Sequence, residues 1–160
     1  MFACIISLLA QIKIDLPSLV PITLQTLGIY LASCILKPKL AFSASLVYVL
    51  IGAVGLPVFS GFNGGINSLL GPSGGYIFSF PITALVISLI VNKKSSTILK
   101  IIAMIIGTII CYFIGTIWFM YVTKNTLLSS LMMCVIPFIP GDLIKIVIAS
   151  ILSKKIKLNQ

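Results

Sequence analysis

The chain has 160 residues, of which 59% are hydrophobic and only 8% are charged, and its formal net charge is +9. A soluble domain of this size could not bury so much apolar surface, so the composition predicts that lipid is its solvent. The positive charge does not indicate a nucleic-acid partner, because the lysines are scattered at the ends of apolar runs and form no basic patch with interleaved aromatic residues.

Six apolar runs follow one another and predict an all-α membrane protein, a bundle of six transmembrane helices in one domain covering residues 1–160. The expected spans cover residues 1–14, 22–36, 40–54, 76–91, 98–122 and 127–152. The first run is short, because a full crossing needs about 17 residues or more. It does not read as a cleavable signal peptide, since no basic region precedes it. Two prolines near residues 137–140 predict a break in the last span.

The lysines orient this bundle. With six spans, eight lysines fall on one side and two on the other, and the lysine-rich side of a membrane protein is cytoplasmic. We therefore expect both termini in the cytoplasm. The eight are Lys37, Lys39, Lys93, Lys94, Lys100, Lys154, Lys155 and Lys157, and the outer two are Lys13 and Lys124.

A glycine-rich stretch joins the third and fourth spans on the predicted outer side. Residues 55–80 read GLPVFSGFNGGINSLLGPSGGYIFSF, with seven of the twelve glycines and no charge. Irregular backbone at membrane depth is tolerated only where it is buried in protein or lines a cavity. The stretch is therefore expected to be a long outer loop that covers a ligand pocket. Asn63 offers an amide to a ligand, or it serves equally well as a turn residue.

Asp142 and Lys145 are the strongest candidates for ligand binding. The chain has only two acidic residues, and an ionisable residue within a span usually faces a cavity or a partner. Positions i and i+3 share a helix face, so the two side chains are expected to meet. The alternative is that Asp142 caps its helix and Lys145 only neutralises it. Asp15, in the outer connection after the first span, reads as a solvated loop acid.

Enzyme functions are not indicated. The chain has no histidine, no paired carboxylates and no Cys/His set, so neither a catalytic group nor a metal site is expected. It also lacks a P-loop, so it cannot harness ATP by itself. Gly28, Gly107 and Gly115 are expected to be packing contacts within spans. Ala3, Ser7 and Ala10 form a small-residue stripe that would let another helix approach, from this chain or from a partner.

Three stretches resemble the signature motifs of the BioY family. They are PITLQTLGIYLA (Pro21–Ala32), GLPVFSGFNGGINSLLGPSGGYIFSFP (Gly55–Pro81) and PFIPGDLIK (Pro137–Lys145). BioY is the biotin-specific substrate-binding component (S-component) of energy-coupling factor (ECF) transporters. The resemblance implies a six-helix fold in a bacterial cytoplasmic membrane, with an outward-facing biotin pocket and no cofactor. It also implies ATP-driven uptake with a transmembrane coupling protein and two ATPases.

The resemblance assigns residues to this function. The acid and lysine of the family's last helix fall on Asp142 and Lys145, which would accept the ureido N–H groups of biotin and donate to its ureido oxygen or its carboxylate. The polar loop residue falls on Asn63, beside backbone groups of Gly64 and Gly65. Phe59 and Tyr76 would wall the pocket, and Ala3, Ser7 and Ala10 would contact the coupling protein.

Two other functions stay open from the sequence. The chain could be a substrate-binding component for another vitamin, such as thiamin or riboflavin, or a membrane assembly protein without a ligand. In the second case the pair of Asp142 and Lys145 would be purely structural, and its apolar replacement would leave function intact.

Overall fold

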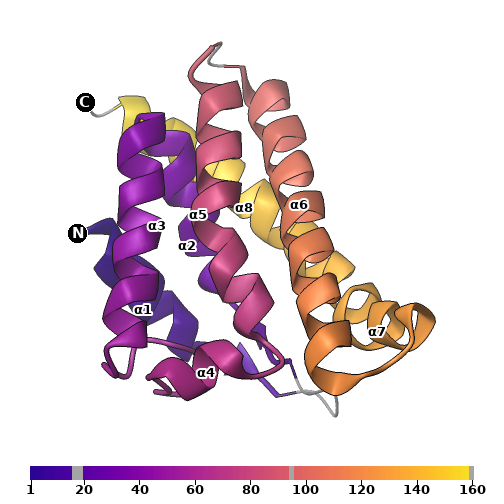
Figure 1. Ribbon diagram of the computed structural model, residues 1–160. Helices are drawn as coiled ribbons and strands as arrows, with labels where there is room; N and C mark the ends of the chain where they lie inside the picture. The colour runs from indigo at the N-terminus through magenta and orange to yellow at the C-terminus, as the bar shows by residue number, and fades with distance from the viewer. Residues whose placement is uncertain (16–19, 94–95, 159–160) are drawn as a thin grey trace.

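The computed structural model describes residues 1–15, 20–93 and 96–158, and almost all regular structure in them is helical (Figure 1). The elements in chain order are α1 (Phe2–Gln11), β1 (Lys13–Ile14), β2 (Ile22–Thr23), α2 (Gln25–Ile35), α3 (Pro38–Ala53), α4 (Ile66–Leu70), α5 (Gly74–Val91), α6 (Thr97–Thr123), α7 (Leu127–Cys134), the 3₁₀ helix η1 (Ile136–Phe138) and α8 (Ile139–Leu158).

Within the part of the chain that the structure describes, three helical stretches are long and apolar enough to cross a membrane, namely α5, α6 and the segment from Leu127 to Ile156. At 1.5 Å per residue, the 27 residues of α6 extend about 40 Å. Three shorter helices, α1, α2 and α3, are also apolar. The chain is thus an all-helical, multi-pass membrane protein. The count of six helices is not confirmed, since the described residues form eight α-helices.

Two local features account for the extra helices. The glycine-rich stretch is not one long loop, because residues 66–70 within it form α4. The last apolar run is broken where predicted: α7 ends at Cys134, η1 contains Pro137, and α8 begins at Ile139. Proline removes a backbone donor and so interrupts the helical ladder there.

The first predicted span, residues 1–14, extends beyond the C-terminal end of helix α1. Helix α1 stops at Gln11, where Ile12 turns extended. The next two residues form β1, which pairs antiparallel with β2 in the register Lys13↔Thr23 and Ile14↔Ile22. Ten helical residues reach about 15 Å, so α1 covers only part of a hydrocarbon core about 30 Å thick.

The two ends of the bundle differ. Helices α4 and α7 and strands β1 and β2 lie at one end, and the last turn of α5, the first turn of α6 and the last turns of α8 lie at the other (Figure 1). Irregular structure therefore gathers at the end that carries the glycine-rich stretch, as its glycine density predicted. Of the lysines assigned to the cytoplasm, Lys94 lies outside the described residues, and so does the side chain of Lys157.

Glycines bring α5 and α6 into close contact. A Cβ built on Gly75 would lie 2.2 Å from the Trp118 Cβ, and one on Gly115 would lie 2.3 Å from the Tyr76 ring. Gly107 meets Ile87 at 2.5 Å in the same way. The predicted packing role of Gly107 and Gly115 is confirmed. Close backbone approach of this kind is a common way for helices to associate in lipid.

The small-residue stripe on α1 faces the interior of the chain. Ala3 is 9% exposed and Ala10 is fully buried, while the Ser7 hydroxyl donates to the Ala3 carbonyl. Nearby, Gly28 of α2 comes so close to α1 that a Cβ would lie 3.1 Å from the Ile6 Cα. In this arrangement Ala3 and Ala10 pack within the chain. A contact of the stripe with a partner stays a prediction.

Candidate functional site

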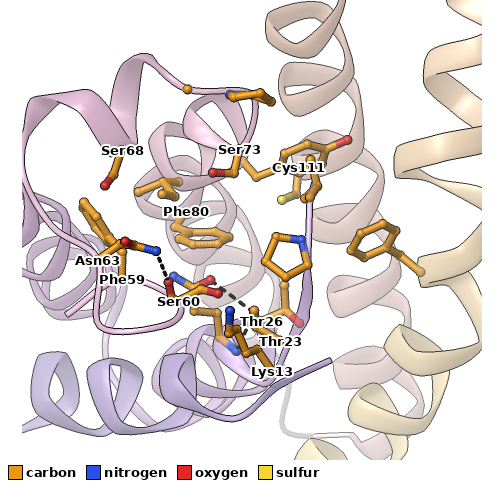
Figure 2. Close-up of a pocket in the computed structure, with 18 of the residues that line it drawn as sticks. Lys13, Thr23, Thr26, Phe59, Ser60, Asn63, Ser68, Ser73, Phe80 and Cys111 are labelled. Carbon is orange, nitrogen blue, oxygen red and sulfur yellow. Dashed lines mark hydrogen bonds between the residues drawn. The ribbon is translucent and has the colours of Figure 1, made fainter. Parts of the chain in front are cut away.

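A cavity of about 370 Å³ opens at the end of the bundle that carries the hairpin (Figure 2). Its lining comes from the hairpin, α2, the segment between α3 and α5, the first turns of α5, and parts of α6 and α8. The three signature stretches, far apart in sequence, thus border one space.

The buried end of the cavity holds Asp142 and Lys145, which are 4% and 5% exposed. Lys145 Nζ donates to Asp142 Oδ1 at 2.8 Å, so the predicted i,i+3 contact is confirmed. Asp142 is not an N-cap, because α8 begins at Ile139 and places this carboxylate within its first turn. The acid still benefits from the partial positive charge at a helix N-terminus.

Two further residues hold this ion pair, and sequence reasoning missed both. Thr26 of α2 donates to Asp142 Oδ1 at 3.2 Å and accepts from Lys145 Nζ at 3.1 Å. The Tyr112 hydroxyl of α6 donates to Asp142 Oδ2 at 2.5 Å. All four side chains line the cavity. A buried ion pair needs such hydrogen bonds, since desolvation of the charges is otherwise unfavourable.

A second polar group lies under the loop that follows α3. Gln25 is 6% exposed, donates through Nε2 to the Tyr48 hydroxyl, and accepts from the Thr23 hydroxyl at 3.1 Å. The Tyr48 hydroxyl donates to the Val58 carbonyl at 3.3 Å. These hydrogen bonds connect α2, α3 and the loop, so they hold the loop in position over the cavity.

The tip of this loop is a tight turn. Asn63 Nδ2 donates to the Ser60 carbonyl at 2.8 Å, and the Phe59 N–H donates to the Asn63 carbonyl at 2.9 Å (Figure 2). The turn role of Asn63 is therefore present. Asn63 also lines the cavity, and its contact with a ligand stays a prediction. Ser60 lines the cavity too, and its hydroxyl is buried without a hydrogen-bond partner among the described residues.

Of the other predicted site residues, two line the cavity and two determine the conformation of the loop. Phe59 and Tyr76 line the cavity, and Phe59 packs edge-on against the Tyr48 ring. Gly64 and Gly65 do not line it. A Cβ on Gly64 would lie 2.3 Å from the Leu56 carbonyl oxygen, and Gly65 has a φ of 86°. These two glycines therefore shape the loop.

Gln11, at the end of α1, ties the loop to the first helix. Its side-chain oxygen accepts from the Phe62 N–H at 2.7 Å. Its Nε2 donates to the carbonyls of Val58 and Phe59 at 3.3 and 3.2 Å. One side chain thus satisfies three backbone groups of a segment that has no helical partners of its own.

We expect Gln11→Met to loosen this loop, because each lost hydrogen bond contributes about 0.5–1.5 kcal/mol. Hydrogen–deuterium exchange should accelerate in residues 56–65, and ligand affinity should fall several-fold. Ser43→Ala is a matched control, since it removes only a hydroxyl bond to the Lys39 carbonyl on α3. Unchanged exchange in the Gln11 variant would show that the loop holds its shape without this residue.

An exposed ion pair borders the mouth of the cavity. Lys13 Nζ donates to Asp15 Oδ1 at 2.9 Å, and the two side chains are 32% and 69% exposed. Both residues line the cavity. Asp15 is a solvated loop acid, as expected, but it has a partner.

Comparison with known proteins places the chain. The model of the BioY family matches residues 1–159. A probable biotin transporter BioY from Pyrococcus horikoshii is 36% identical over 160 residues, which cover 99% of this chain and 93% of the relative. The biotin transporter BioY of Thermotoga maritima is 36% identical over 156 residues, or 98% and 91% of the two chains. This chain belongs to the BioY family.

The fold agrees with this membership. A crystal structure of the S-component for biotin from an ECF-type ABC transporter superposes with a TM-score of 0.91 and 31% sequence identity. The match covers 98% of this chain and 86% of that chain. The fold of this BioY protein is therefore that of an S-component, and its named relatives are transporters.

Proposed function

We propose that this BioY protein captures biotin from the outer side of a bacterial cytoplasmic membrane and delivers it for ATP-driven uptake. The observation that carries the proposal is the buried pair of Asp142 and Lys145 in the wall of a cavity of about 370 Å³. A buried charge pair that lines a cavity is able to bind a polar ligand group, whereas a purely structural pair has no need of the cavity.

The chemistry of the cavity suits the ring system of biotin. Asp142 carries four lone-pair sites on two oxygens, and three hydrogen bonds from Lys145, Thr26 and Tyr112 occupy only part of this capacity. The remaining site accepts one ureido N–H group, or both N–H groups bind if one of these three protein bonds is exchanged, and Lys145 donates to the ureido oxygen.

The remaining residues that line the cavity can contact the apolar rings of biotin. Phe59 and Tyr76 pack against the bicyclic ring system. Asn63 and the Ser60 hydroxyl, which has no partner among the described residues, supply further hydrogen bonds from the loop. A mostly apolar pocket with a few placed polar groups is the usual form of a small-molecule site.

The proposed topology has six crossings with both termini in the cytoplasm. The lysine bias supports this orientation, and so does the gathering of irregular structure at the cavity end of the bundle (Figure 1). The absence of a P-loop from the sequence supports a need for separate ATPases. The partners are then an ECF transmembrane coupling protein and two ATPases.

Isothermal titration calorimetry of the purified protein tests the proposal. We expect saturable binding of biotin with one site per chain, and no displacement by thiamin or riboflavin. Radiolabelled biotin uptake should increase when the coupling protein and ATPases are co-expressed. Absence of saturable biotin binding would overturn the proposal, and displacement by thiamin or riboflavin would assign the cavity to another vitamin.

A further inference from the structure

Two cationic side chains, Lys13 and Lys145, are among the described residues that line the cavity. They differ in how easily a ligand can replace the anion that each one already binds. Lys145 is buried at one end, and Lys13 is about one-third exposed at the mouth. We propose that Lys13 recognises the carboxylate of the ligand and that Asp15 is its displaceable counter-ion. This inference rests on the proposed function, because it assumes a ligand with a neutral ring system and an anionic tail.

The buried end is unfavourable for a second carboxylate. Lys145 Nζ already lies 2.8 Å from Asp142 Oδ1, and Thr26 accepts from the same ammonium. A ligand carboxylate there would share one cation with Asp142, and the two anions would repel each other out of contact with water. The ureido group carries no net charge and avoids this repulsion.

The mouth is favourable because its anion is easily exchanged. The Asp15 side chain is 69% exposed, so it regains water when it leaves Lys13. A ligand carboxylate then takes its place, and the number of ion pairs at the mouth stays the same.

The position of Lys13 is built into the fold. Strand β1 pairs Lys13 with Thr23, which fixes its backbone beside the cavity. Its ammonium lies against Gly61 of the loop, only 2.9 Å from where a Cβ would stand. Any residue larger than glycine at position 61 would therefore displace the Lys13 ammonium group. Figure 2 shows Lys13 near its strand partner Thr23 among the residues that line the cavity.

These placements orient the ligand. The neutral ring system points toward Asp142, and the carboxylate tail points toward solvent at the hairpin. An analogue with an uncharged tail should keep every contact at the buried end and lose only the contact with Lys13.

Binding of biotin and of its neutral amide, biotinamide, to the purified protein tests the assignment. The wild-type protein should bind biotin about three- to tenfold more tightly than biotinamide, a range that allows for solvent screening of a partly exposed charge. Lys13→Met should bind both ligands with the affinity that the wild type has for the amide. Lys124→Met, which removes the other exposed outer lysine, is the matched control and should keep the preference.

Two further arms sharpen the test. Asp15→Asn should increase the preference for biotin, because Lys13 then has no competing anion. Raising the salt concentration from about 0.05 M to about 0.5 M should reduce the preference in the wild type, since exposed charges are screened. Amide binding by Lys13→Met reports that the variant is folded.

The outcomes separate the two proposals. If the wild type binds neither ligand, the proposed biotin capture fails. If the wild type binds both with equal affinity, or if Lys13→Met keeps the preference for biotin, biotin capture stands and the assignment of the carboxylate to Lys13 is overturned.

Discussion

Asp142→Asn should weaken biotin binding at least tenfold. The substitution replaces a charged acceptor, and a hydrogen bond to a charged group contributes about 1.5–3 kcal/mol. It also leaves the Lys145 ammonium buried without its counter-charge, and breaking a buried pair costs about 3–5 kcal/mol of stability. Calorimetric titration with biotin and the melting temperature of the purified variant measure the two effects.

The double variant Asp142→Asn/Lys145→Met separates binding from stability. It removes both charges together, so no unpaired buried charge remains, and we expect a melting temperature closer to that of the wild type than the single variant has. Biotin binding should remain at least tenfold weaker than in the wild type. If the double variant binds biotin with wild-type affinity, the pair is purely structural and its role in ligand binding is refuted.

Gly115→Ala should disturb the cavity through helix packing. The new Cβ would lie 2.3 to 2.6 Å from three carbons of the Tyr76 ring, so the ring or helix α5 has to move. Overpacking of this kind costs about 1–3 kcal/mol. Because Tyr76 lines the cavity, we expect both a lower melting temperature and weaker biotin binding.

Gly141→Ala is the matched control for this substitution. A Cβ there would meet only Ile22, at an ordinary distance of 3.9 Å. Alanine is also favoured over glycine within a helix by about 1 kcal/mol, so the melting temperature should not fall. A Gly115 variant that melts like the wild type would show that α5 and α6 tolerate a wider spacing.

The ion pair of the cavity was predictable because it is local. Asp142 and Lys145 are three residues apart on one helix, and helical geometry alone brings them together. The partners of that pair were not predictable in the same way. Thr26 and Tyr112 lie 116 and 30 residues from Asp142 in sequence. Thr26 falls in the first signature stretch, but local spacing shows for neither residue that its side chain contacts α8.

In the glycine-rich stretch, too, local features were predictable and contacts with distant segments were not. Its glycine density predicted irregular backbone over a cavity, and residues Phe59, Ser60 and Asn63 do line one. The short helix α4 within it was not expected, nor was the attachment of the loop to Gln11 of α1. Both depend on how the loop returns over neighbouring helices.

Composition alone established a membrane protein, since no soluble fold of this length can hide so much apolar surface. Local spacing added the ion pair of α8 and the packing glycines, and the three motifs indicated the family. The cavity itself required the tertiary structure. Hydrophobic periodicity states which face of a helix is apolar, but not which helix it meets. The end of α1 at Gln11, the hairpin that brings Lys13 to the mouth, and the convergence of α2, α6 and α8 on Asp142 all follow from contacts between distant segments.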